Sequence, residues 1–257
     1  MLCAACAATT VFAQSEPNPD ELTATPNRPT VTDIAETTQR GVLELEFGIA
    51  ATHREQALVG LLKFGLLRDL ELRWAGSPWQ HDSALRTGGV TDTDLGLRWR
   101  LLHQARVQPT VSLQYTATLP TAGALLGSGE SDHGLGVLVS KDLPAQFHLD
   151  ANLTRLWLGR PRAGAARGGF DQAWLPAFTL AHPIRGKWAL AMEFSGVTRA
   201  GPTGPLVQNL WAVTYTPKPR LVIDAAVQYR VIGNVPNVVY VAGFTWAIAD
   251  LYRGRRR

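Results

Sequence analysis

Apolar residues recur at every second position along most of this chain. In the clearest stretch, Val111, Leu113 and Tyr115 alternate with Ser112 and Gln114. Successive side chains of a β-strand point to opposite faces, so a period of two predicts strands with one apolar and one polar face. An amphipathic helix would instead repeat its apolar residues every 3.6 positions. The pattern therefore predicts an all-β protein.

About twelve strands are predicted after residue 39. Most are close to the ~9–11 residues that a tilted strand needs to cross a bilayer. A soluble β-sandwich is the alternative, but its strands usually have only ~5–6 residues. The predicted strands are 43–51, 56–66, 70–74, 94–100, 107–119, 133–141, 147–159, 172–182, 187–195, 205–216, 221–231 and 240–248, and the pattern is weaker in 56–66, 133–141, 147–159, 172–182 and 205–216.

The connections between these strands alternate in length. Tight turns alternate with longer stretches rich in Gly, Pro, Ser and charge, except that the first and last hairpins have short connections on both sides. This alternation predicts an antiparallel up-and-down transmembrane β-barrel of the bacterial outer membrane, with short periplasmic turns and longer extracellular loops. The predicted turns are 67–69, 103–105, 143–146, 184–186 and 217–219, and the predicted long loops are 76–91, 120–132, 160–171 and 199–205.

Trp and Tyr residues fall into two groups, one near the turns and one near the loops, as expected for side chains at the two lipid headgroup regions. Two features of the sequence fit the barrel less well. By strict alternation Arg155 would face lipid, at a cost of about 2–4 kcal/mol near the midplane. Pro176 and Pro183 would each remove a hydrogen-bond donor from the strand that contains them.

The ends of the chain differ from the barrel region, which we place at 40–250. Residues 1–13 resemble a secretory signal peptide, and because no Lys or Arg precedes the apolar run we expect the full signal to begin upstream. Both cysteines lie in this segment, so the exported protein has no thiol. Residues 14–39 are polar, contain proline and show no clear period, which predicts a leader or a plug in the barrel lumen. Residues 251–257 form a basic extension.

Charged and amide residues on the polar faces of the strands are the candidate functional residues. Two interpretations remain open: they line an aqueous pore, or they form ion pairs that fill the interior. The predicted lumen-lining residues are Glu44, Glu46, Lys63, Glu71, Arg73, Asp94, Arg98, Arg100, Gln114, Asp150, Glu193, Asp224 and Arg230.

Other chemistry has weaker support in the sequence. The six histidines are scattered, so we expect solvated side chains, no metal ion and no cofactor. Ser128, Asp132 and His133 lie close together in a Gly-rich loop, but a catalytic triad needs a held geometry. The formal charge of +4 is matched by the four arginines at 253–257, so no nucleic-acid partner is expected.

Three segments resemble a known family: Asn27–Asp33 (NRPTVTD), Gly41–Gly48 (GVLELEFG) and Phe64–Arg73 (FGLLRDLELR). They are similar to bacterial outer-membrane transporters of the phenol-degradation meta-pathway type. The resemblance implies a β-barrel that imports aromatic or hydrophobic compounds. Residues 243–248 also resemble the terminal-strand signal read by the barrel assembly machinery.

We therefore expect a channel or transporter for the passive uptake of small molecules, and not an enzyme. Its expected partners are a small-molecule solute, outer-membrane lipid and the barrel assembly machinery. Two alternatives are a barrel-embedded lipid hydrolase and a structural barrel with a blocked lumen.

Overall fold

The structure is a computed structural model that describes residues 21–84, 86–123, 126–127, 129–159, 170–198, 204–234 and 236–252. The predicted signal peptide, residues 14–20 of the leader and residues 253–257 lie outside the described residues. A short 3₁₀ turn at Pro144–Gln146 interrupts the β-structure. The described part of the chain contains no helix able to traverse a lipid bilayer.

Twelve long strands of 10 to 16 residues make up the barrel, and a thirteenth strand of three residues lies in one loop. All pairings between neighbouring strands are antiparallel. The strands are β1 (Val42–Ala51), β2 (Glu55–Leu67), β3 (Leu70–Asp82), β4 (Thr87–Gly89), β5 (Thr93–Leu102), β6 (Thr110–Leu119), β7 (Asp132–Asp142), β8 (His148–Gly159), β9 (Phe170–Arg185), β10 (Trp188–Val197), β11 (Leu206–Lys218), β12 (Leu221–Ile232) and β13 (Val238–Asp250).

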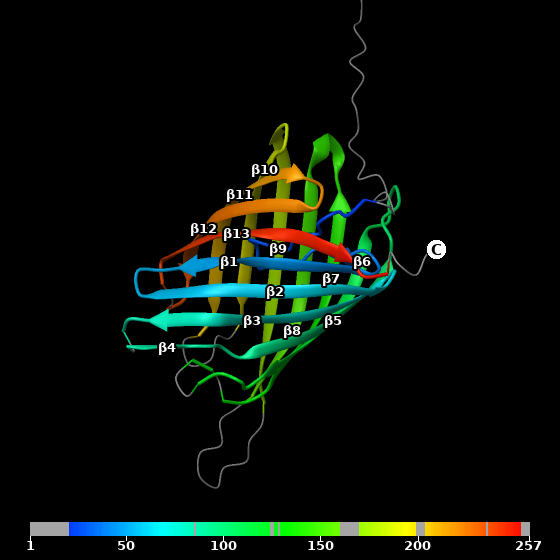
Figure 1. Ribbon diagram of the computed structural model, residues 1–257. Helices are drawn as coiled ribbons and strands as arrows, with labels where there is room; N and C mark the ends of the chain where they lie inside the picture. The colour runs from blue at the N-terminus through cyan, green and yellow to red at the C-terminus, as the bar shows by residue number, and fades with distance from the viewer. Residues whose placement is uncertain are drawn as a thin grey trace, which may run out of the picture.

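The long strands follow one another around a closed ring (Figure 1). Each pairs with the next long strand in the chain, and β1 pairs with β13 to close the sheet. A closed ring leaves no edge strand with unpaired backbone groups, as a sheet surrounded by lipid requires. The predicted all-β up-and-down barrel of about twelve strands is confirmed.

Polar and apolar side chains are distributed in the opposite way to those of a water-soluble protein. The largest fully buried side chains include Arg98, Lys63 and Glu71, which point into the barrel. Large apolar side chains lie on the outside, where Trp74 is 58% exposed and Tyr240 is 61% exposed. An apolar exterior of this extent is stable only when lipid covers it.

Some predicted boundaries are wrong. The strand predicted at 107–119 begins at Thr110, because Pro109 has no N–H to donate and the preceding residues form a longer turn in which Val107 is 87% exposed. The predicted loop at 76–91 contains the end of β3 and all of β4, because the ladder between β2 and β3 continues to Asp82.

The prolines of β9 lie where one neighbouring ladder has ended. Pro176 pairs with Leu153 of β8, but the ladder to β10 stops one residue away at Ala177. Pro183 lies beyond the end of the ladder to β8 and next to a register shift in the ladder to β10. The missing N–H groups are therefore tolerated within a strand of 16 residues.

Arg155 faces outward, as strict alternation predicts, and no register shift interrupts β8 at this position. Its guanidinium lies 4.8 Å from the centre of the Trp174 ring and donates a hydrogen bond to Gln172. Both partners come from β9, near the long-loop end of the barrel. The cation–π contact and the amide partially replace water around this charge.

Candidate functional site

The interior of the barrel contains the chain's own residues 21–40, called the lumen segment from here on. The lumen segment forms hydrogen bonds with inward-facing side chains of eight strands, so it lies within the ring. Near its two ends, the Ala24 N–H donates to Pro219 O and the Thr37 hydroxyl donates to Arg68 O. Both acceptors lie in short turns. The segment therefore enters and leaves the barrel at the short-turn end.

Four glutamates of the barrel wall hold the lumen segment by its main chain. Each is essentially inaccessible to solvent, and a buried carboxylate needs hydrogen-bond donors. The segment has no regular structure that would satisfy its own N–H groups. The segment therefore supplies N–H donors to the glutamates, and the glutamates supply acceptors to the segment. The N–H of Thr25 donates to Glu44 (2.9 Å), those of Asn27 and Arg28 to Glu46 (2.9 and 3.1 Å), that of Thr32 to Glu193 (2.6 Å) and that of Thr38 to Glu71 (2.7 Å).

Lys63 of β2 neutralises two of these glutamates. Its ammonium group lies 2.5 Å from Glu44 and 2.6 Å from Glu46, and it also donates to Thr25 O at 2.5 Å. Residues 44 and 63 are direct cross-strand partners, which brings their side chains together on the inner face. The triad therefore joins β1, β2 and the lumen segment in one network.

Asp33 of the lumen segment is held between two arginines of the wall. Its carboxylate lies 2.9 Å from Arg73 and 3.0 Å from Arg98, and it accepts a hydrogen bond from Gln114 at 2.8 Å. Burial alone would raise the pKa of the Asp33 carboxyl. The two guanidinium groups and the amide outweigh it and hold this pKa well below its usual range. Asp33 therefore stays ionised inside the barrel.

Arg28 makes the second charged contact between the segment and the wall. Its guanidinium lies 3.3 Å from Asp224 and rests over Gly48 and Gly243, which face each other on β1 and β13. A Cβ atom on Gly243 would lie 2.6 Å from the Arg28 Nη2 atom. The absence of side chains at these two glycines leaves the space that the guanidinium fills.

Ser112 and Ser140 hold the lumen segment at Ala35. Ser140 Oγ accepts a hydrogen bond from the Ala35 N–H at 2.7 Å, and the Ser112 hydroxyl donates to Ala35 O. Alternation places both serines on the polar face, but the sequence analysis did not single them out. Small hydroxyl side chains are common on such faces, so the sequence offered no stronger signal for them.

The structure divides the predicted lumen-lining residues into three groups. Nine contact the lumen segment directly: Glu44, Glu46, Lys63, Glu71, Arg73, Arg98, Gln114, Glu193 and Asp224. Asp150 reaches it through Ser140, whose hydroxyl donates to Asp150 at 2.5 Å. The others lie elsewhere: Asp94 accepts from Thr118 at 2.5 Å, Arg100 pairs with Asp69 at 2.7 Å, and Arg230 lies near the long-loop end of β12.

The residues considered for catalysis are not brought together. Asp132 and His133 are successive residues of β7, so their side chains point to opposite faces. His133 is hydrogen-bonded to the Tyr115 hydroxyl at 2.8 Å, whereas Asp132 accepts from the Gly159 N–H. Ser128 lies outside the described residues.

The closed ring, its apolar exterior and its polar interior define a β-barrel of the bacterial outer membrane. Comparison of the sequence with protein-family models and with curated proteins finds no match. Among solved structures, the COG4313 outer membrane channel from Pseudomonas putida F1 is similar with a TM-score of 0.64 and 14% identity, over 83% of this chain and 98% of the channel.

Two solved porins are also similar to this barrel. The NanC porin has a TM-score of 0.59 and 11% identity, over 80% of this chain and 100% of the porin. The KdgM porin has a TM-score of 0.57 and 4% identity, over 80% of this chain and 99% of the porin. At these identities the comparisons establish a shared fold with one outer-membrane channel and two porins.

Proposed function

We propose that this protein is an outer-membrane channel for the passive uptake of small molecules, and that the lumen segment is the plug that controls its opening. The observation that carries the proposal is the charged interior that bonds residues 21–40 from eight strands. In this proposal a signal peptide at 1–13 directs export, and the barrel assembly machinery inserts residues 40–250.

The contacts of the lumen segment favour a plug that moves over one that is permanently fixed. Every wall side chain that holds it lies within six residues of the short-turn end of its strand. When the segment withdraws, water can solvate the exposed wall charges, and the Lys63 pairs with Glu44 and Glu46 remain. The ring itself is held by backbone ladders that do not involve the segment.

Small aromatic or hydrophobic compounds are the proposed solutes. This part of the proposal rests on the resemblance to the meta-pathway transporters. One of the three segments that carry the resemblance, Asn27–Asp33, contains the plug residues Asn27, Arg28 and Asp33. The sequence features that suggest the family are thus partly those that hold the plug.

Solute flux into proteoliposomes tests the proposal. A panel from sugars to phenols is compared between vesicles with the protein and empty vesicles, and phenols are expected to enter faster with the protein. Deleting residues 15–38 is expected to increase that flux and to raise single-channel conductance in planar bilayers. An unchanged conductance trace would contradict the plug.

A structural barrel with a closed lumen is the second candidate function, because the described lumen segment fills the interior near the short turns. It predicts neither flux nor conductance for the intact protein. The lipid hydrolase alternative is disfavoured by the opposite orientation of Asp132 and His133. An assay for fatty-acid release by the purified protein distinguishes it from a channel.

A further inference from the structure

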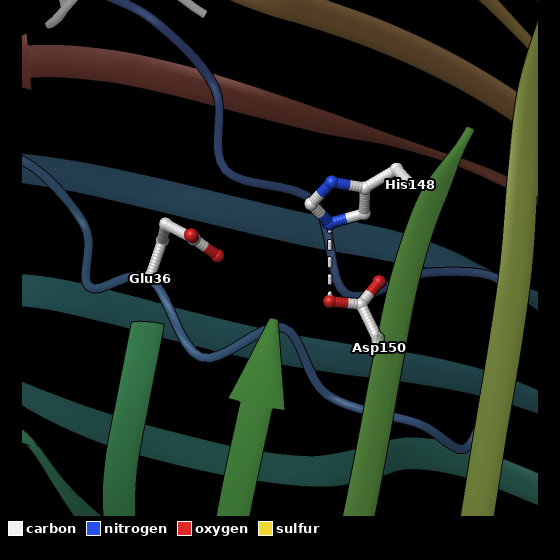
Figure 2. Close-up of side chains that lie close together, drawn as sticks. All are labelled: Glu36, His148 and Asp150. Atoms are coloured by element: carbon white, nitrogen blue, oxygen red, sulfur yellow. Dashed lines mark hydrogen bonds and ion pairs between the residues drawn. The ribbon is translucent and has the colours of Figure 1, made fainter. Parts of the chain in front are cut away.

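Three side chains with metal-binding atoms converge where the lumen segment meets the barrel wall (Figure 2). His148 and Asp150 lie two residues apart at the start of β8, so both point into the lumen, and Glu36 faces them from the lumen segment. One nitrogen or oxygen atom from each residue lies within 4.8 Å of those from the other two. His148 is not the solvated side chain expected from the scattered histidines, because it is only 24% exposed and contacts two carboxylates.

Neighbouring groups hold two of these side chains in position. The Asp142 carboxylate lies 2.6 Å from Nδ1 of His148, which leaves Nε2 directed toward Asp150 at 3.2 Å. A histidine that binds a metal ion usually donates its other ring N–H to a carboxylate in this way, which fixes the ring and its tautomer. The Ser140 hydroxyl, itself bonded to the lumen segment, orients Asp150.

Glu36 brings a further carboxylate to the His148 imidazole, with which it interacts electrostatically. Among the described residues, its carboxylate has no hydrogen-bond or ion-pair partner; only its main-chain oxygen accepts, from Arg98 at 3.1 Å. It nevertheless faces a second carboxylate, that of Asp150, at the half-buried lumen surface. The His148 imidazole contacts Asp150 and interacts with Glu36, so either a proton on this ring or a metal ion bound by all three residues can balance the two carboxylates.

We propose that Glu36, His148 and Asp150 bind a divalent transition-metal ion that ties the lumen segment to the barrel wall. One imidazole nitrogen and two carboxylate oxygens suit Zn²⁺ and its neighbours in the first transition row, whereas Mg²⁺ and Ca²⁺ prefer oxygen ligands alone. Three protein ligands leave room for water to complete the coordination. The positions of these three side chains define the metal site, so the proposal does not depend on whether the barrel conducts solute.

Calorimetric titration of the purified, chelator-treated barrel with Zn²⁺ tests the site. One Zn²⁺ per chain is expected to bind, and H148A and E36Q are each expected to lower the affinity at least tenfold. H182A is the matched control, because the His182 ring is at the same end of the barrel but bonds to Ala145 O outside the cluster. The mobility of unboiled and boiled protein on a gel verifies that each variant is folded.

Three results would overturn the inference. The first is a wild-type barrel that binds no Zn²⁺, in which case a proton on His148 joins the carboxylates. The second is an affinity that E36Q leaves unchanged, which would place any metal on the wall alone. The third is displacement of Zn²⁺ by an equal concentration of Mg²⁺. None of these results depends on solute flux, so they are separate from a failure of the channel proposal.

Discussion

Asp33 connects the lumen segment to two adjacent strands through one carboxylate. Arg73 of β3 and Arg98 of β5 both contact it, and both also lie near Glu71, so the four groups alternate in charge. Removing one member of a buried ion network leaves its partners without compensation, which destabilises more than the network itself stabilises. The arginines would then favour a state in which water reaches them.

The substitution D33N is expected to release the plug. A hydrogen bond to a charged group contributes about 1.5–3 kcal/mol, so the equilibrium between inserted and withdrawn segment should shift about ten- to a hundredfold toward withdrawal. Single-channel recording measures this as a larger open fraction. D94N is the control, because Asp94 accepts a hydrogen bond from Thr118 near the long-loop end of the barrel and not from the segment. Equal open fractions for D33N and wild type would contradict this role.

Asp33 also sets a pH dependence whose sign follows from its lowered pKa. A carboxylate with a depressed pKa stabilises the inserted state at pH values above its ordinary pKa of 3.8, and this contribution is lost as the pH falls through the lowered value. The difference in open fraction between D33N and wild type should therefore be the same at pH 7 and pH 5. It should shrink below about pH 4. A difference that disappears already at pH 5 would refute the assignment.

The sequence predicts which residues of the barrel wall face inward, but it does not predict which residues they contact. The period of two places Glu71, Arg98 and Glu193 on the polar face without any knowledge of the fold. Asp33 and Asn27 lie in a segment without periodicity, so no pattern indicates what they contact. Because the sequence does not indicate the contacts of Asp33 and Asn27, it could not decide whether the wall charges line a pore or form ion pairs.

At the scale of single elements, β2 is shaped by contact with the end of the lumen segment. Gly65 points inward, and the N–H of Gly41 donates to its carbonyl at 2.7 Å. A Cβ atom on Gly65 would lie 2.6 Å from Thr38 O and would also overlap the carbonyl of Gln39. Main chain therefore packs against main chain at this position, which only glycine allows.

The substitution G65A is expected to displace the end of the lumen segment and to raise channel conductance. The overlap is with backbone atoms, which cannot rotate away as a side chain would. G60A is the matched control on the same strand, since its Cβ would meet only the Phe47 ring at 3.4 Å and Gly76 O at 3.6 Å. Conductance measured in planar bilayers should rise for G65A alone. A rise of equal size in both variants would show that β2, and not the contact, is responsible.

Strand positions were predicted well from alternation, and strand ends less well. All five weaker segments form strands, including 172–182, which contains the two prolines and extends to Phe170–Arg185. Ends depend on ladders with distant strands, as the continuation of β3 to Asp82 beside β2 illustrates. Such pairing leaves no mark in the local sequence.

For the whole molecule, the membrane replaces the usual hydrophobic core. The outer faces carry Leu95, Leu97 and Trp99 on β5 alone, each at least 40% exposed. The interior is largely polar, so the apolar surface that folding buries must be covered by lipid. The closed twelve-strand ring was predictable because period, strand length and turn alternation all agree on it. The exact strand ends and the partners of the interior side chains required the structure.

The substitution L97R on the outer face should destabilise the folded barrel by about 2–4 kcal/mol, because it places a charge near the middle of the lipid layer. V107R is the control: the same change lies in a turn where Val107 is 87% exposed, and it should have an effect near zero. Denaturant titration of the barrel in lipid vesicles measures both. Equal stabilities would contradict a lipid-facing position for Leu97.

Both ends of the lumen segment leave through the same mouth of the barrel, where Ala24 meets Pro219 and Thr37 meets Arg68. The lumen segment is therefore a hairpin-shaped plug that enters the barrel from its short-turn end. Pulling it out requires no part of the polypeptide to travel across the bilayer. In the proposed channel, a pull on the segment from the short-turn side would withdraw it, and its covalent link to β1 would keep it available for reinsertion.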